Sequence, residues 1–257
     1  IERGLASGQH LAGTGGLLQV GPMKVITDGS LNTRTAYCRD PYPGVRDDPY
    51  GLLLVPPEQL RSLLRRAAAA GFDCAVHAIG DEANTLALQA FAASGAHGRI
   101  EHAQLLATAD LPRFAELGVI ASVQPAHALD DRAVAERLWA GRTGRAYLAR
   151  SLLDAGAVLA FGSDAPVAPL DPWLAMAAAV GRGGSEPWHP EQAVSVAEAL
   201  AASVAHPSRD PVRIEPGMPA DLLLCEADPL RCELDVLQRM PVYATLVAGR
   251  FSYRADG

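Results

Sequence analysis

The stretch CAVHAIGDEAN, Cys74–Asn84, indicates the fold and raises the question of function. It begins as a short apolar run that is typical of a buried strand, and Ala/Leu-rich helical sequence follows it. His77 interrupts the run with an imidazole, where a buried strand would ordinarily continue with an apolar side chain. The chain repeats this strand–helix unit. A histidine in a buried strand needs a group that binds its ring nitrogens.

Short apolar runs alternate with longer helical segments along most of the chain. The predicted strands are MKVIT at 23–27, CAVHAI at 74–79, RIEHAQ at 99–104, VIASVQ at 119–124 and VLAFGS at 158–163. Helices are predicted at 56–71, 85–95, 109–118, within 132–156, at 171–182 and at 194–205. Apolar strands bounded by helices are typical of a parallel sheet covered on both faces, so we predict an α/β protein.

The pattern changes near the C-terminus. The segments ADLLLCEADPL, 220–230, and VYATLVAGRFSYR, 242–254, predict strands without a helix between them. We therefore expect a larger α/β part over residues 1–212 and a small β appendage over residues 213–257.

Composition excludes several classes of partner. The formal charge is −7 and only 20% of residues are charged, so no basic face is available for nucleic acid. The four cysteines form no CxxC pair, which favours reduced thiols and a cytoplasmic location. No apolar window approaches the ~18 residues of a membrane span, so we expect no membrane partner. Because the chain begins with Ile1, we expect the natural N-terminus to lie upstream.

Four polar residues coincide with the predicted strands. Lys24 lies in the first, His77 in the second, His102 at the end of the third and Asp164 directly after the fifth. The carboxyl ends of parallel strands meet at one edge of a sheet, and we expect all four residues there. Burying each of them separately is costly, whereas one divalent cation would satisfy them together. Nitrogen and carboxylate ligands suit zinc first, with iron or manganese as alternatives.

Other polar residues near these positions are candidates for contacting a small-molecule substrate: Asp28, Arg34, Asp81, Gln124 and His127. Four of them have a structural alternative. A local turn network could occupy Asp28 and Arg34, Asp81 could cap the next helix, and His127 could be a surface histidine.

Six segments carry a resemblance to a known family: MKVITDGSLNTRTA, VHAIGDEAN, RIEHAQLL, GVIASVQPAH, FGSDAPVAPLDPW and IEPGMPADLLLCEADPL. Their order and spacing resemble the amidohydrolase superfamily, specifically its YtcJ-like (amidohydrolase 3) branch. The resemblance implies a (β/α)8 TIM-type barrel with a small β domain. It also implies one or two metals, held by an HxH pair, a lysine carbamate or glutamate, two further histidines and an aspartate.

Matched by motif, Lys24 is similar to the fourth-strand lysine of that family, whose carbamate form would be an anionic ligand. His77 and His102 are similar to the fifth- and sixth-strand ligands, and Asp164 to the eighth-strand aspartate, which also acts as general acid and base. The resemblance thus implies a metal-dependent hydrolase that uses metal-activated water on amide-like, non-peptide C–N bonds.

The chain departs from the family in two respects. It contains no HxH sequence, and it has five strand–helix units where a closed barrel needs eight. We therefore expect only strands four to eight of the barrel, over residues 1–212. Such a half-barrel would expose strand edges and an apolar interior face, which favours self-association or a partnership with a missing N-terminal half.

Three interpretations follow from the sequence. The chain is a metal-dependent C–N hydrolase or its catalytic half, a truncated and catalytically defective amidohydrolase-like chain, or an unrelated α/β binding domain.

Overall fold

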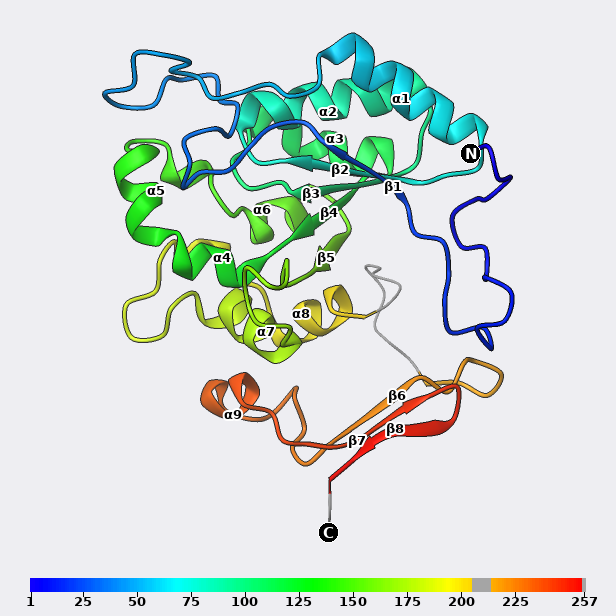
Figure 1. Cartoon of the computed structure of the whole chain (residues 1–257). Helices are drawn as coiled ribbons and strands as arrows, with labels where there is room; N and C mark the ends of the chain where they lie inside the picture. Colours follow the sequence, from blue (N-terminus) through cyan, green and yellow to red (C-terminus); the bar gives the residue numbers. More distant parts are fainter. Residues whose placement is uncertain (205–213, 256–257) are drawn as a thin grey trace. The chain divides into compact units, whose positions relative to one another are not determined.

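A parallel β-sheet organises the first part of the chain (Figure 1). The computed structural model describes residues 1–204 and 214–255. It divides into two units, the first formed by Ile1–Val123 with Asp130–Ala160 and the second by Gln124–Leu129 with Phe161–Gly257. The predicted domain boundary between residues 212 and 213 lies outside the described residues.

The sheet has five strands in sequence order: β1 Met23–Ile26, β2 Cys74–Ala78, β3 Gly98–His102, β4 Ile120–Val123 and β5 Leu159–Phe161. β1, β2, β3 and β4 pair in parallel, each with the next. The prediction of an α/β protein with a parallel five-stranded sheet is therefore confirmed.

Helices connect the strands of the first unit: α1 Pro57–Ala69, α2 Asp81–Ser94, α3 Leu111–Leu117, α5 Arg132–Leu138 and α6 Ala149–Asp154. Local sequence sets their ends. α1 begins at a proline, whose missing N–H costs nothing in a first turn. α2 ends at Gly95, which adopts a left-handed conformation (φ 67°) that favours glycine.

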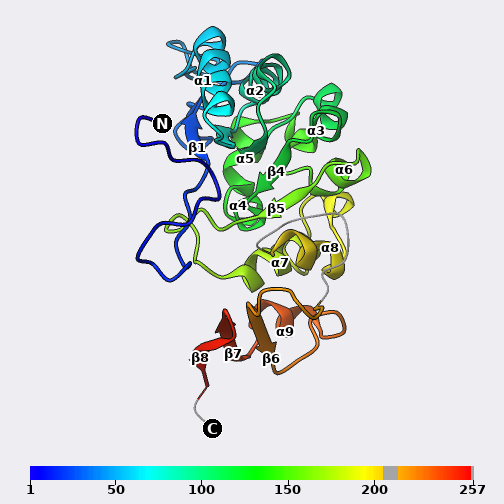
Figure 2. The ribbon, with the colours of Figure 1, turned by 90° about the vertical axis from the view of Figure 1, so that its right-hand side faces the viewer.

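The helices cover one face of the sheet. Figure 2 shows α1, α2 and α3 together on one side of the strands. The face that packs under them is apolar and almost fully buried, with Val76, Ile100 and Ala121 at 0% exposure. Strand alternation places these side chains on one surface of the sheet and the intervening residues on the other.

The opposite face of the sheet is partly open. It carries Lys24, Ile26, His77, Arg99 and Glu101, which lie at matching positions of β1, β2 and β3. Ile26 is 50% exposed and Lys24 is exposed. The expectation of a sheet covered on both faces is therefore wrong. The expectation of an apolar inner face is also wrong, because this face carries charged side chains.

The second unit contains α4 Pro125–Asp130, whose last residue belongs to the first unit, α7 Pro172–Gly181, α8 Val196–Ala202 and α9 Leu234–Gln238. Asp171 caps α7 by accepting hydrogen bonds from the backbone N–H groups of Trp173 and Leu174. α9 packs against α7 so closely that a Cβ on Gly181 would lie 2.3 Å from Leu234. Ala205, at the end of the last predicted helix, lies outside the described residues.

A three-stranded antiparallel sheet completes the second unit, with β6 Leu222–Cys225, β7 Val242–Val247 and β8 Arg250–Arg254. The predicted C-terminal strands are confirmed. The expectation that no helix separates them is wrong, because the short helix α9 lies between β6 and β7 in the chain. Its residue Leu237 is buried. α4 was also not predicted, since its six residues are too few for a clear helical period.

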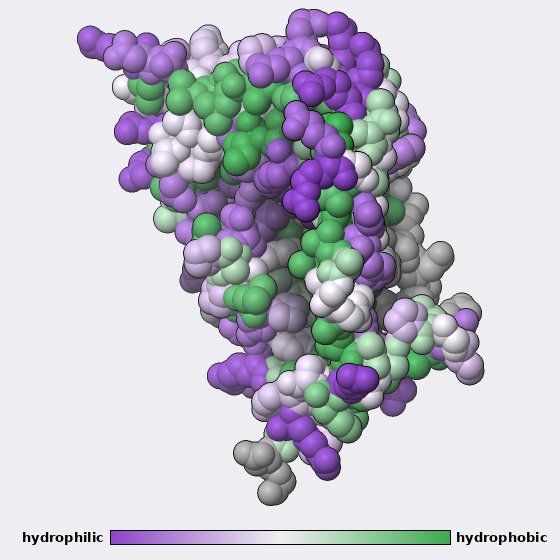
Figure 3. Space-filling model, turned by 45° about the vertical axis from the view of Figure 1, so that its right-hand side comes forward, coloured by the Kyte–Doolittle hydropathy of each residue, from purple (hydrophilic) through white to green (hydrophobic). Residues whose placement is uncertain are grey.

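The surface mixes residue types. The space-filling view interleaves apolar and hydrophilic residues on the side that it shows (Figure 3). Among residues 1–204 and 214–255, no helix has both the length and the apolar character needed to cross a bilayer.

The two faces of the sheet should respond differently to the same substitution. Ile100→Ala removes a fully buried side chain and should lower the free energy of unfolding by about 2–5 kcal/mol. Ile26→Ala, on the open face, should lower it by about 1 kcal/mol or less. Urea denaturation of both variants checks this, and equal losses would contradict the assignment of a covered and an open face.

Candidate metal centre

The strand register brings several predicted residues of the first unit to one region. His77 lies level with Ile26 on β1 and Glu101 on β3, and His102 lies level with Ala78. His77 is therefore the next-to-last residue of β2 and His102 the last residue of β3, both near the carboxyl edge of the sheet. This part of the sequence-based prediction agrees with the positions seen.

The rings of His77 and His102 are in contact. Their centroids lie 4.5 Å apart, with the ring planes at 68°. Regular alternation would direct the two side chains to opposite faces of the sheet, but His102 has φ 75° and the next residue, Ala103, has φ 41°. A left-handed conformation costs a non-glycine residue about 1–2 kcal/mol, and such strain is concentrated at functional sites.

His77 is held by the loop after β1. Its Nε2 lies 3.2 Å from the carbonyl oxygen of Gly29 and 3.5 Å from Oδ1 of Asp28. A carbonyl oxygen only accepts, so the hydrogen bond requires the ring hydrogen on Nε2. In the neutral ring this tautomer places the lone pair on Nδ1, the nitrogen that a cation could bind.

Asp28 is fully buried between the ends of β1 and β2. Its carboxylate accepts hydrogen bonds from the backbone N–H groups of Tyr37, Ile79 and Gly80, at 2.9, 3.1 and 2.9 Å. Burial raises the pKa of Asp28 to about 7, although these donors pull the pKa downwards. Asp28 thus fixes the backbone around His77, and its predicted contact with substrate stays a prediction.

Arg34 stands on a tightly bonded loop. Gly29 N–H donates to Thr35 O at 3.1 Å, and Thr35 N–H donates to Ser30 O at 3.0 Å. Asn32 ties the loop to Asp131 through a 2.9 Å hydrogen bond. Arg34 itself is exposed and left-handed, with φ 60°. The turn network considered for this segment is present, and it presents Arg34 at the surface.

Asp81 occupies the first turn of α2 and is fully buried. It accepts a hydrogen bond from Arg39 N–H at 2.9 Å and pairs with Arg145 at 2.9 Å. It does not cap α2, because the N-cap position is Gly80. This carboxylate therefore joins the loop after β1, the start of α2 and the segment that contains Arg145.

Lys24 lies farther from the carboxyl edge than predicted. It is the second residue of β1 and is level with Ala75, two residues before His77. The expectation that all four predicted ligands stand at strand ends is wrong for Lys24. Two residues of strand correspond to about 6.6 Å, which is comparable to the length of a lysine side chain. Lys24 also shares the open face of the sheet with His77.

Glu101 lies on that same open face, level with His77. It pairs with Arg99 at 2.6 Å on its own strand. This ion pair gives Glu101 a structural role on the open face.

The second unit brings Asp164 and His127 together. A ring nitrogen of His127 and a carboxylate oxygen of Asp164 lie within 4.8 Å of each other. Asp164 follows β5 by three residues and is left-handed, with φ 55°. His127 is buried in α4, which begins directly after Gln124. The backbone N–H of His127 donates to the backbone oxygen of Gln124 at 3.1 Å.

The donor types of both units suit a divalent cation. Imidazole nitrogen and carboxylate oxygen bind zinc at about 2.0–2.2 Å, so two ligands of one tetrahedral ion lie about 3.4 Å apart. A small side-chain movement would bring the ring nitrogen of His127 and the carboxylate oxygen of Asp164 from within 4.8 Å to this distance. The sequence predicted His127 as a substrate contact, with a surface histidine as the alternative. That alternative is wrong, because His127 is buried.

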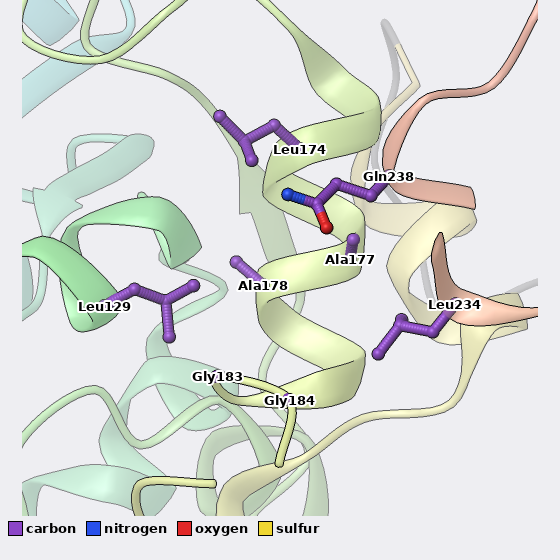
Figure 4. A pocket seen from close by; sticks show the side chains of 8 residues that line it. All are labelled: Leu129, Leu174, Ala177, Ala178, Gly183, Gly184, Leu234 and Gln238. Carbon is purple, nitrogen blue, oxygen red and sulfur yellow. The ribbon is translucent and has the colours of Figure 1, made fainter. Parts of the chain in front are cut away.

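An apolar hollow of about 290 Å³ lies elsewhere in the second unit (Figure 4). Its lining includes one side-chain amide and otherwise apolar groups: Leu129, Leu174, Ala177, Ala178, Gly183, Gly184, Leu234 and Gln238. Leu129 follows His127 by two positions, about 200° around a helix, so the two side chains leave α4 on opposite sides. The hollow is therefore separate from the His127–Asp164 pair.

A parallel α/β sheet with histidines at its carboxyl edge defines a class of proteins that place their sites at that edge. Comparison with known proteins makes the assignment specific, because residues 5–253 match the model of the amidohydrolase family. The chain belongs to the amidohydrolase family.

Individual relatives agree with this assignment. The chain is 31% identical to the putative amidohydrolase YtcJ of Bacillus subtilis, over 93% of the chain and 48% of that protein. It is 30% identical to the N-substituted formamide deformylase of Arthrobacter pascens, over 77% of the chain and 40% of that protein. A solved structure of an uncharacterized metal-dependent hydrolase from Pyrococcus horikoshii matches with a TM-score of 0.70 and 36% identity, over 78% of the chain and 41% of that structure.

The chain thus spans less than half the length of these relatives. The family match and the relatives agree with one another. They rule out the interpretation of the chain as an unrelated α/β binding domain.

Asp28 provides a test of the frame around His77. Asp28→Asn replaces an acceptor oxygen with a donor that faces backbone N–H groups, so it should lower the free energy of unfolding by about 1–3 kcal/mol. It should also accelerate tryptic cleavage after Arg34, because the loop loses its anchor. Asp73→Asn, at an exposed carboxylate just before β2, is the matched control. Equal stability and cleavage rates in the two variants would refute the anchoring role of Asp28.

Proposed function

We propose that this chain provides the metal-binding part of a hydrolase that cleaves amide-like, non-peptide C–N bonds. The observation that carries the proposal is the contact between His77 and His102 at the carboxyl edge of a parallel sheet, in a chain of the amidohydrolase family. The proposed ligands are Lys24, His77, His102 and Asp164, for one or two ions. Zinc is the first choice of metal, with iron or manganese as alternatives.

A divalent cation, when bound, supplies a water that deprotonates near neutral pH and a Lewis acid for the substrate carbonyl. The residues of the chain do the rest. Asp164 accepts the proton of the attacking water at a carboxylate oxygen and delivers it to the leaving nitrogen. Asp28 and the carbonyl of Gly29 hold the His77 ring in one orientation and one tautomer.

Lys24 requires a modification to take part. As an ammonium group it has three donors and no acceptor, so it cannot bind a cation. Its carbamate would add an anionic oxygen pair at the end of a long side chain. That added length would compensate for its position two residues before His77.

The substrate is proposed to be a small molecule with an amide or formamide group. The formamide deformylase of Arthrobacter pascens supports this class. Arg34 and Gln124 are the proposed contacts of its polar groups, with His127, Asp28 and Asp81 as the further predicted positions. We propose no nucleic-acid or membrane partner and a cytoplasmic location, in keeping with the acidic composition.

We also propose that the sheet is part of a (β/α)8 barrel that a further polypeptide segment or a second chain completes. The partly open face with Ile26 and Lys24 supports this arrangement, since a closed barrel would cover it. The second candidate function is a catalytically defective chain. It is favoured by the absence of any HxH sequence in the 257 residues.

The metal content of the purified chain tests the centre. Wild-type protein should hold about one or two ions of zinc, iron or manganese per chain after dialysis, measured by plasma mass spectrometry. His77→Ala and His102→Ala should lose most of that metal, because each removes a ligand. His97→Ala, at an exposed histidine, should keep it. Unchanged metal in the first two variants would show that these histidines are not ligands.

Turnover of N-substituted formamides by metal-loaded protein tests the chemistry. Asp164→Asn should lower kcat by about 10²–10⁴-fold, because it removes the proton acceptor. Asparagine tolerates the left-handed backbone at this position, so the variant should fold. Metal binding without turnover, also in the presence of a complementing N-terminal half, would favour the defective chain over the hydrolase.

A further inference from the structure

His127 is buried in a position that a metal centre explains better than a substrate pocket does. Its residue exposure is 8%, and His102 is the one other histidine that is buried in the described ranges 1–204 and 214–255. His10 and His97 are exposed in the same ranges. An imidazole removed from water is costly unless another group engages its nitrogens.

Its neighbour is a carboxylate, Asp164. Two donor atoms of different type, nitrogen and oxygen, lie within 4.8 Å of each other in one structural unit. Both are held by short-range backbone geometry. The turn that follows β4 bonds His127 N–H to Gln124 O, and the turn that follows β5 bonds Val167 N–H to Asp164 O at 2.9 Å.

The turn after β5 also bears on this pair, because Asp164 is left-handed, with φ 55°. Aspartate adopts this region more readily than most residues with a side chain, so the turn costs little. It holds a carboxylate oxygen of Asp164 within 4.8 Å of a ring nitrogen of His127.

We infer that His127 is a metal ligand, together with Asp164. This inference rests on the proposed function and extends it, since it adds a ligand from the segment after β4. The chain lacks an HxH pair, and His127 would supply an imidazole in its place. Five side chains, counting the carbamate of Lys24, would then be available for one or two ions, which leaves coordination positions for water when two ions are bound.

The alternative is that His127 contacts substrate only. The two roles differ in a measurable way, because a metal ligand changes metal affinity in the absence of substrate. If His127 contacts only substrate, replacing it should raise KM and leave the metal affinity unchanged.

Zinc binding and cobalt spectroscopy of the full chain test the inference. His127→Gln should raise the dissociation constant for at least one zinc ion by about 10-fold or more, measured by competition with a chromophoric chelator. In cobalt-loaded protein, the same variant should change the visible d–d absorption, because the ligand set changes. His97→Gln, at an exposed histidine, is the matched control and should match wild type in both measurements.

A double-mutant cycle isolates the shared ion. If His127 and Asp164 bind the same cation, the effects of His127→Gln and Asp164→Asn on zinc affinity should be non-additive. Unchanged zinc affinity and cobalt spectrum in His127→Gln, alongside wild-type metal binding that depends on His77 and His102, would overturn the inference and leave the proposed function intact. Wild-type protein that binds no zinc would instead refute the proposed centre as a whole.

Discussion

The parallel register of β1, β2 and β3 is the constraint on which the candidate centre depends. It sets Ile26, His77 and Glu101 at one level and Ala78 and His102 at the next. Because parallel strands all end at the same edge, residues that are separated by 25 positions in the chain, His77 and His102, come into ring contact. A shift of this register by one residue would send the His77 side chain to the covered face and separate the rings.

Around this pair, two buried carboxylates bind backbone N–H groups and hold the loops in place. Asp28 collects three backbone N–H groups, and Asp81 links Arg39 and Arg145. These buried interactions replace the helices or strands that would otherwise shape the loop between β1 and α1. They explain how a long segment with little regular structure holds Arg34 and Gly29 in fixed places, and they connect the motif after the first strand to the histidine on the second.

The sequence was sufficient for the positions of the strands, the helices that alternate with the strands and the family, because apolar runs and local motifs report on them directly. It also placed His77 and His102 at strand ends. It could not locate Lys24 within its strand, since the boundary of β1 depends on pairing with β2, and it missed α4, whose six residues show no clear period.

The remaining errors also have physical causes. Periodicity does not report on which face of a sheet has a covering layer, so the open face with Ile26 was not foreseen. Nor does it report left-handed backbone at His102 and Asp164, which arises from the packing of turns. The proximity of His127 to Asp164 joins two segments that are 37 positions apart, and a single sequence without an alignment gives no signal for it.

The left-handed backbone at His102 and Asp164 also bears on how such a chain would evolve. Glycine adopts this conformation at less cost than any residue with a side chain, so glycine at either position would relieve strain while removing a donor atom. Selection for durability alone would therefore drive both positions towards glycine. A lineage that keeps histidine and aspartate there accepts a less durable fold in exchange for its chemistry.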